Sequence, residues 1–199
     1  MQIILASQSL YRKQQLENFG LPFQAVRPKV DEEELKEQGP EDLVELTRFL
    51  AHAKALSLRE DFPKAVILGS DQLVEFRGRR LNKPGSLENS IQQLSDLSGG
   101  THRLITSLTV AGADRLFTFT DITTIKMRSL SSELIRGYLN LDKPFDCAGS
   151  YKFEKAGLGL IEEVDSADPS AIQGLPLLSL VRGLGDLNLK LENLWGIKS

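Results

Sequence analysis

The stretch IILASQSLYRKQQL, residues 3–16, passes from a short apolar run into residues that favour a helix. Residues 3–6 predict a buried strand, and Ser7-Gln8-Ser9 supplies polar residues of the type that cap a helix N-terminus. A strand followed at once by a helix is typical of α/β proteins. We therefore expect an α/β fold whose first strand-to-helix turn lies at residues 7–9.

Two cations, Arg12 and Lys13, follow Tyr11 in the first turn of this expected helix. Cations are disfavoured there because the N-terminus of a helix carries partial positive charge. A bound anion would relieve the conflict, since free backbone N–H groups and hydroxyls at a helix start bind phosphate. The alternative is a capped surface helix whose basic side chains are solvated.

The rest of the chain alternates helical and strand patterns. Apolar residues recur at helical spacing over residues 41–58, and the acidic stretch 30–41 predicts a loop. Strands are expected at 23–28, 65–76, 103–112, 115–127 and 157–166, with a hairpin around Gly78. Further helices are expected at 86–100 and 131–139, and the stretch 172–184 begins a last helix near Pro176. The pattern predicts a mixed central sheet with flanking helices, forming two lobes around a cleft within a single domain over residues 1–199.

Composition narrows the function classes. A net charge of -3 gives no basic surplus, so nucleic-acid binding is not expected. The lone cysteine, Cys147, cannot form an internal disulfide, which fits a reducing compartment. The N-terminal apolar run is too short for a signal peptide, and no segment approaches the ~20 apolar residues of a membrane span. We expect a cytoplasmic protein without a membrane partner.

The chemistry-bearing residues do not match the common nucleotide-binding or hydrolase signatures. GxxxxGK[ST], GxGxxG and GxSxG are absent, and the two histidines lack metal-ligand spacing. Asp71 stands out because it follows an apolar strand at Gly69-Ser70, where an α/β fold usually binds its ligand. A lone Asp in such a place can equally cap a turn.

Seven motifs occur in the order found in one enzyme family. They are LASQSLYRKQQL, VDE, AHAKA, GSDQLVEFRGRRLNKPGS, LSGGTH, CAGSYKFE and IQGLPL. The chain resembles the Maf family of nucleoside triphosphate pyrophosphatases over nearly its whole length, which implies a Maf/inosine triphosphatase-like fold. The family cleaves a nucleoside triphosphate between its α- and β-phosphates with the help of a divalent metal cation such as Mg, Mn or Co.

The resemblance also implies roles for individual residues. Asp71 matches the catalytic acid and a metal ligand, and Glu32 matches the acidic residue that helps to hold the metal. Positive charge that is already in place offsets the charge that builds on phosphoryl oxygens. The phosphate-binding positions are matched by Ser7, Arg12, Lys13, Lys54 and Lys83, with Lys13 standing where the family has a second arginine.

Three residues make the chain look like the 7-methyl-GTP branch of that family: Tyr11, Gln72 and Glu154. A carboxylate such as Glu154 can accept both adjacent N–H donors of guanine, and N7-methylation makes the base cationic, which favours stacking on Tyr11. The pyrimidine branch carries Thr and Gln in place of Gln72 and Glu154. A dTTP/UTP pyrophosphatase and a nucleotide-binding regulator of septum formation are the alternatives, and the resemblance leaves a homodimer open.

Overall fold

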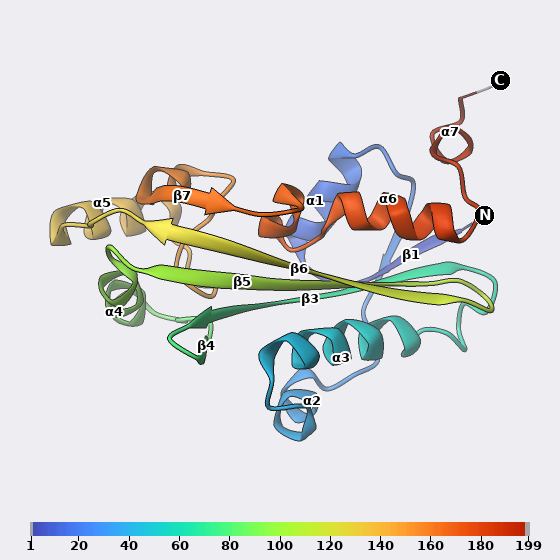
Figure 1. The fold of residues 1–199 in the computed structure, drawn as a ribbon, viewed down its shortest axis with the longest axis horizontal. Coiled ribbons are helices and arrows are strands. Elements are labelled where there is room, and N and C mark those ends of the chain that lie inside the picture. Colours follow the sequence, from blue (N-terminus) through green and yellow to red (C-terminus); the bar gives the residue numbers. More distant parts are fainter. Residues whose placement is uncertain (1, 198–199) are drawn as a thin grey trace. The chain divides into compact units, whose positions relative to one another are not determined.

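The computed structural model describes residues 2–197 and contains a mixed seven-stranded sheet with flanking helices (Figure 1). The strand order is β2-β1-β3-β5-β6-β7, and β4 pairs with β3. The strands are β1 (Ile3–Ala6), β2 (Gln24–Val26), β3 (Val66–Phe76), β4 (Arg79–Leu81), β5 (Thr101–Ala111), β6 (Leu116–Met127) and β7 (Ile161–Asp165). β1 is parallel to both β2 and β3, whereas the pairs β3–β4 and β6–β7 are antiparallel. The expected α/β class is confirmed.

The chain divides into two compact units. The first comprises Met1–Gln72, Thr106–Asp121 and Asp168–Ser199, and the second comprises Leu73–Ile105 and Ile122–Ala167. Strands β3, β5 and β6 contribute residues to both units. The expected single domain with a cleft between two lobes stays a prediction, and each unit is described by itself below.

Side chains alternate between two apolar layers in the first unit. Ile3 and Leu5 belong to the cluster that includes Leu16 of α1 (Leu10–Asn18) and Leu180 of α6 (Leu177–Asp186). Ile4 and Ala6 instead join the cluster that contains Ala55 and Leu58, at the C-terminal end of α3 (Leu43–Leu56). Successive residues of a strand face opposite sides, so β1 is buried on both faces. Figure 1 shows α3 on one side of these strands and α1 and α6 on the other.

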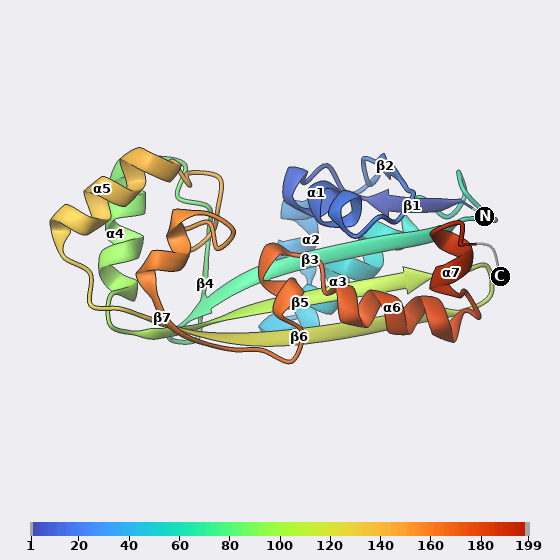
Figure 2. The ribbon, with the colours of Figure 1, turned by 90° about the horizontal axis from the view of Figure 1, so that it is seen from above.

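The second unit pairs two helices, α4 (Leu87–Leu97) and α5 (Ser132–Asp142), which lie side by side (Figure 2). Ser86 and Ser131 cap these helices through hydrogen bonds from Asn89 N and Leu134 N. Arg77 and Gly78 both have positive φ, as a two-residue turn between β3 and β4 requires. The expected hairpin at Gly78 and both expected helices are confirmed.

The antiparallel arrangement of the two long strands β5 and β6 follows from two side-chain pairs. Thr109 hydrogen-bonds Thr118 and Ser107 hydrogen-bonds Thr120, each at 2.9 Å. The residue number falls along β5 from the first pair to the second and rises along β6, so the two strands run in opposite directions. The connecting turn is closed by Gly112 N donating to Arg115 O. The expected antiparallel neighbours are confirmed.

Three expectations about local structure were wrong. Residues 32–38 form helix α2 (Glu32–Gln38) rather than a loop, because Asp31 accepts hydrogen bonds from Glu33 N and Glu34 N and acidic residues suit a helix N-terminus. Residues 156–160 form the 3₁₀ helix η1 (Ala156–Leu160), so the strand β7 begins only at Ile161. The 172–184 helix is not the last, because α7 (Leu191–Leu194) follows it.

Candidate functional site

The turn between β1 and α1 brings Ser7 and Arg12 together. Ser7 is buried, and its hydroxyl oxygen accepts hydrogen bonds from Ser9 N at 3.1 Å and Arg12 Nη1 at 3.3 Å. Ser9 is the N-cap residue, and its side chain accepts from Arg12 N. The expected strand, cap and helix start are therefore confirmed.

The Arg12 guanidinium is held at two points. Besides its contact with Ser7, its Nε donates to the carbonyl of Gly174 at 2.8 Å. Burial lowers the pKa of Arg12, while the negative charges of Asp71 and Glu32 oppose that shift. Arginine stays protonated under ordinary conditions, so this side chain presents a fixed positive charge near two carboxylates.

Lys54 of α3 joins two carboxylates from different elements. Its Nζ lies 2.6 Å from Asp71 Oδ1 on β3 and 3.0 Å from Glu32 Oε2 on α2. The Lys54 and Asp71 side chains are only 4% and 7% exposed, whereas Glu32 is 44% exposed. Burial tends to raise the pKa of Glu32, but the charge and hydrogen bond of Lys54, together with the charges of Lys36 and Arg12, hold this pKa below its usual value.

Close packing of α3 on β3 creates this contact. A Cβ at Gly69 would lie 2.2 Å from Ala51 O and 2.6 Å from Ala55 N, so only glycine permits the observed approach. Lys54 and Asp71 lie next to these contact points along their own elements. The small residue in the strand thus brings the ammonium group to the carboxylate.

Asp71 does not stand at the end of its strand. β3 continues to Phe76, so the expectation of a strand end at Gly69-Ser70-Asp71 was wrong. The strand that ends at this level is the neighbouring strand β1. It stops at Ala6, and its pairing with β3 covers only residues 66–68 of β3. Asp71 therefore lies just beyond the carboxyl end of β1, the place where α/β proteins commonly bind ligands. Its Oδ2 is buried and has no hydrogen-bond partner among the described residues.

Gln72 is tied to the chain near the start of α6. Its Nε2 donates to Thr106 Oγ1 at 2.8 Å, to Ala171 O at 2.9 Å and to Ile172 O at 3.2 Å. The 3₁₀ helix η2 (Pro169–Gln173) contains both carbonyls. The predicted role of Gln72 in specificity stays a prediction, although its amide hydrogens already have protein acceptors.

The other expected site residues lie in two places. Tyr11 and Lys13 are half-buried in the first turn of α1, within the first unit. Lys83 is exposed in the segment between β4 and α4, and Glu154 is exposed in a turn before η1, both in the second unit. The first unit thus brings together Ser7, Arg12, Glu32, Lys54 and Asp71, and the roles of all these residues stay predictions.

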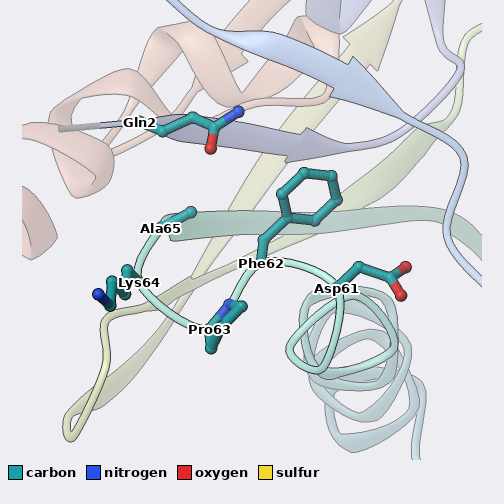
Figure 3. A pocket seen from close by; sticks show the side chains of 6 residues that line it. All are labelled: Gln2, Asp61, Phe62, Pro63, Lys64 and Ala65. Carbon is teal, nitrogen blue, oxygen red and sulfur yellow. The ribbon is translucent and has the colours of Figure 1, made fainter.

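A surface hollow elsewhere in the first unit contains none of these residues. It is lined by Gln2, Asp61, Phe62, Pro63, Lys64 and Ala65 (Figure 3). Gln2 and Ala65 directly precede the parallel strands β1 and β3, so this hollow lies at their amino ends. Asp71 lies at the opposite end of the same pair, which makes the hollow a poor candidate for the site.

Comparison with known proteins places the chain among its relatives. The family model described as "Maf: Maf-like protein" matches residues 2–187. The chain belongs to the Maf family. A curated relative from Bdellovibrio bacteriovorus, named 7-methyl-GTP pyrophosphatase, is 43% identical over 94% of this chain and 98% of its own length.

Two further curated relatives carry the same name. The protein of Syntrophotalea carbinolica is 40% identical over 94% of this chain and 95% of its own length. That of Xanthomonas axonopodis pv. citri is 38% identical over 90% of this chain and 93% of its own length. The Maf resemblance inferred from seven short motifs is therefore confirmed over nearly the whole chain.

Sequence reasoning missed two residues, Ser70 and Gln15, that hydrogen-bond the backbone next to the candidate site. Ser70 is fully buried, and its hydroxyl lies 2.9 Å from the same Gly174 carbonyl that accepts from Arg12. Gln15, one helical turn after Arg12, donates to Ser170 O at 2.8 Å and to Leu175 O at 3.2 Å. The IQGLPL motif contains two of these acceptors, Gly174 and Leu175, but a backbone carbonyl leaves no side-chain pattern in the sequence.

The described helices include none that is both long and apolar enough to cross a membrane.

Proposed function

We propose that this chain hydrolyses 7-methyl-GTP to 7-methyl-GMP and pyrophosphate. The observation that carries the proposal is the shared name of Maf-family relatives at 38–43% identity over nearly the full chain. The fold adds a cluster of the charged residue types that phosphoryl transfer uses, gathered beyond the carboxyl end of β1. In this reaction water adds across the α–β phosphoanhydride bond.

Charge balance indicates what this cluster needs in order to bind a triphosphate. Arg12 and Lys54 supply two positive charges, which the carboxylates of Glu32 and Asp71 offset. A polyphosphate carries several negative charges, so it requires further cations to bind here. We assign Lys13 and Lys83 to this role, together with a divalent metal ion.

The carboxylates fit a magnesium-type ion. No group of three or more His, Cys, Asp or Glu side chains within residues 2–197 is arranged to hold a metal by itself. Mg²⁺, however, is usually held by one or two carboxylates, with substrate phosphates and water completing its shell. Glu32 and Asp71 meet at one ammonium group, and Asp71 Oδ2 is a buried oxygen without a described partner. A divalent cation bound by these two residues would offset negative charge on the phosphate oxygens.

Asp71 is the group we assign to water activation. Lys54 occupies its Oδ1, which fixes the orientation of the carboxylate. Oδ2 is the remaining oxygen, which activates water either as a general base or by helping to hold the metal ion. Lys54 also keeps positive charge beside the reacting phosphate. Arg12 and the Ser7 hydroxyl hold the phosphate chain, because both lie at the start of α1, where the helix N-terminus favours anions.

Recognition of the base is assigned to Glu154 and Tyr11. Glu154 is exposed, and Tyr11 is half-buried in the first turn of α1. A carboxylate accepts the two guanine N–H donors, and the cationic methylated ring gains about 0.5–2 kcal/mol from an aromatic face. Binding of the base and the phosphates in a cleft between two lobes remains part of this proposal.

The test is pyrophosphate release from 7-methyl-GTP, GTP, UTP and dTTP by the purified protein with Mg²⁺, Mn²⁺ or Co²⁺. We expect the highest kcat/KM for 7-methyl-GTP and loss of turnover in excess EDTA. Restoration by added metal serves as the control for irreversible damage. A preference for UTP or dTTP would assign the protein to pyrimidine nucleotides instead, and nucleotide binding without hydrolysis would favour a regulatory role.

A further inference from the structure

The segment 170–175, which joins η2 to α6, is held by side chains that donate to its backbone carbonyls. Two of the donors come from α1, two from β3 and one, Thr106, from β5, and all belong to the first unit. Gln15 donates to Ser170 O and Leu175 O, Gln72 donates to Ala171 O and Ile172 O, and Arg12 donates to Gly174 O. The single hydroxyl hydrogen of Ser70 is shared between Gly174 O at 2.9 Å and Ser107 O of β5 at 2.8 Å. Five carbonyls of six consecutive residues are thereby engaged by side chains.

The side-chain amide of Gln72 donates its hydrogen bonds to this segment and to Thr106. The two N–H groups face three acceptors, two of which are carbonyls of η2 and the third the Thr106 hydroxyl. Thr106 in turn donates to Ala171 O at 3.1 Å. A donor that is already satisfied cannot also read the edge of a base, so the contacts of Gln72 serve the segment.

The carbonyl of Gly174 connects this segment with Arg12. It accepts from Arg12 Nε at 2.8 Å and lies 2.9 Å from Ser70 Oγ. Gly174 has φ +99, and a Cβ there would lie 3.4 Å from Arg12 Nε. The positive φ favours glycine on conformational grounds, and a Cβ there would be in van der Waals contact with the guanidinium.

Arg12 needs such support to bind phosphate well. Its contacts with Gly174 and Ser7 use two of the five guanidinium N–H donors and fix the plane of the group. A planar group in a fixed orientation makes paired hydrogen bonds to phosphate, whereas a freely rotating one loses entropy on binding.

We propose that Gln72 and Ser70 are positioning residues for phosphate binding. They fix the 170–175 segment, and through the Gly174 carbonyl they hold the Arg12 guanidinium in the orientation that receives a phosphate group. This inference rests on the proposed function, in which Arg12 contacts the phosphate chain. It assigns Gln72 a role that does not depend on the base, in contrast to the specificity role expected from the sequence.

The test uses inorganic tripolyphosphate, which carries phosphates and no base, with binding followed by titration calorimetry. We expect Gln72→Met to weaken binding about 3- to 30-fold and Ser70→Ala about 2- to 10-fold, as lost hydrogen bonds allow. In an Arg12→Ala background both changes should have no further effect, because their influence passes through Arg12. Ser90→Ala is the matched control, since Ser90 of α4 is a fully buried serine whose hydroxyl donates to the carbonyl of the N-cap residue Ser86.

The nucleotide series separates positioning from base reading. If Gln72 positions Arg12, Gln72→Met lowers kcat/KM for 7-methyl-GTP, GTP and dTTP by the same factor. A loss confined to 7-methyl-GTP, wild-type affinity of Gln72→Met for tripolyphosphate, or additive losses with Arg12→Ala would each overturn the inference.

Two controls complete the design. Thermal melting shows whether each variant is folded, and if Gln72→Met does not fold, the Ser70→Ala and Arg12→Ala cycle decides by itself. Failure of wild-type protein to bind tripolyphosphate would also overturn the inference. Failure of the proposed function is a separate result, because it would appear as absence of pyrophosphate release from 7-methyl-GTP by the wild-type protein.

Discussion

Lys54 Nζ donates to Asp71 Oδ1 at 2.6 Å, although the two residues are 17 positions apart and lie on a helix and a strand. Both side chains are buried, so neither charge is well hydrated. Removing one partner of a buried ion pair leaves the other uncompensated, which is strongly destabilising. Substitutions that test catalysis at this pair must therefore keep a hydrogen-bonding group in place.

Asp71→Asn is such a substitution. The amide oxygen can still accept from Lys54, but the side chain can no longer take a proton from water or bind a cation with full charge. We expect kcat to fall at least ~10²-fold with a folded protein, as is usual when an acid/base group is lost. Asp114→Asn, in the exposed β5–β6 turn, is the matched control, and near-normal turnover of Asp71→Asn would contradict the assignment.

Gly69→Ala tests the close approach of α3 to β3. The new Cβ would lie 2.2 Å from Ala51 O, so α3 must move away and take Lys54 with it. We expect a loss of about 1–3 kcal/mol in the free energy of unfolding, as overpacked cores show, measured by urea denaturation. A second expectation is reduced activity in the folded fraction.

The control for that change is Gly137→Ala in α5, where a new Cβ meets no atom within 4 Å. Alanine is favoured over glycine inside a helix by about 0.5–1 kcal/mol, so this variant should be neutral or more stable. Equal stability of Gly69→Ala and the wild type would mean that the helix and strand are not in the close contact described.

Lys83→Ala tests an exposed cation of the second unit. If Lys83 contacts the phosphate chain, its loss should lower kcat/KM about 10- to 100-fold, as expected for one hydrogen bond to a charged group. The melting temperature should not change, because the side chain is exposed. Lys64→Ala, at another exposed lysine that lines the hollow of Figure 3, should leave the kinetics unaffected. Unchanged kinetics of Lys83→Ala would mean that Lys83 is a solvated surface charge that does not contact the phosphate chain.

Glu154→Gln addresses specificity. A neutral amide keeps the size of the side chain but loses the charge that complements a methylated guanine, so discrimination should suffer more than cleavage. We expect a loss of about 1.5–3 kcal/mol in kcat/KM for 7-methyl-GTP and little loss for UTP or dTTP. Tyr11→Ala should act in the same sense through lost stacking. Glu163→Gln, exposed on β7, is the control, and equal losses for all nucleotides would exclude a role in reading the base.

The buried His102 predicts how stability depends on pH. It forms a hydrogen bond with Tyr151 through Nε2, and burial lowers its pKa to about 4 while Glu75 opposes the shift. Between about pH 6.5 and 4 the unfolded chain binds a proton at this residue that the folded protein does not, so stability is lost as pH falls. From pH 7 to 5 this loss amounts to about 2 kcal/mol.

Urea denaturation at the two pH values checks this prediction. His102→Gln should remove that part of the pH dependence, whereas His52→Gln, exposed on α3, should retain it. Carboxylates with lowered pKa, such as Glu75 beside Arg103, also destabilise the protein on acidification, and their contribution persists in both variants. An identical pH dependence of His102→Gln and the wild type would contradict a neutral buried histidine.

Local patterns in the sequence were sufficient for much of the fold. Strand β1, the Ser9 cap, helix α3 and the Gly78 hairpin follow from neighbouring residues, because apolar periodicity, capping and turn preferences act over a few positions. The acidic stretch 30–41 was misassigned because the same residues suit a solvated loop and a capped surface helix. A single hydrogen-bonding choice at Asp31 decides between them.

The candidate site divides in the same way. The sequence by itself determined the family, through motifs in a fixed order, and indicated Ser7, Arg12, Glu32, Lys54 and Asp71 as candidates. Only the tertiary structure decided that Lys54 joins Asp71 to Glu32, and that the carbonyl of Gly174, 162 residues after Arg12, holds its guanidinium. Such contacts depend on how closely helices pack on the sheet and on where backbone carbonyls point, and neither leaves a periodic pattern in the side chains.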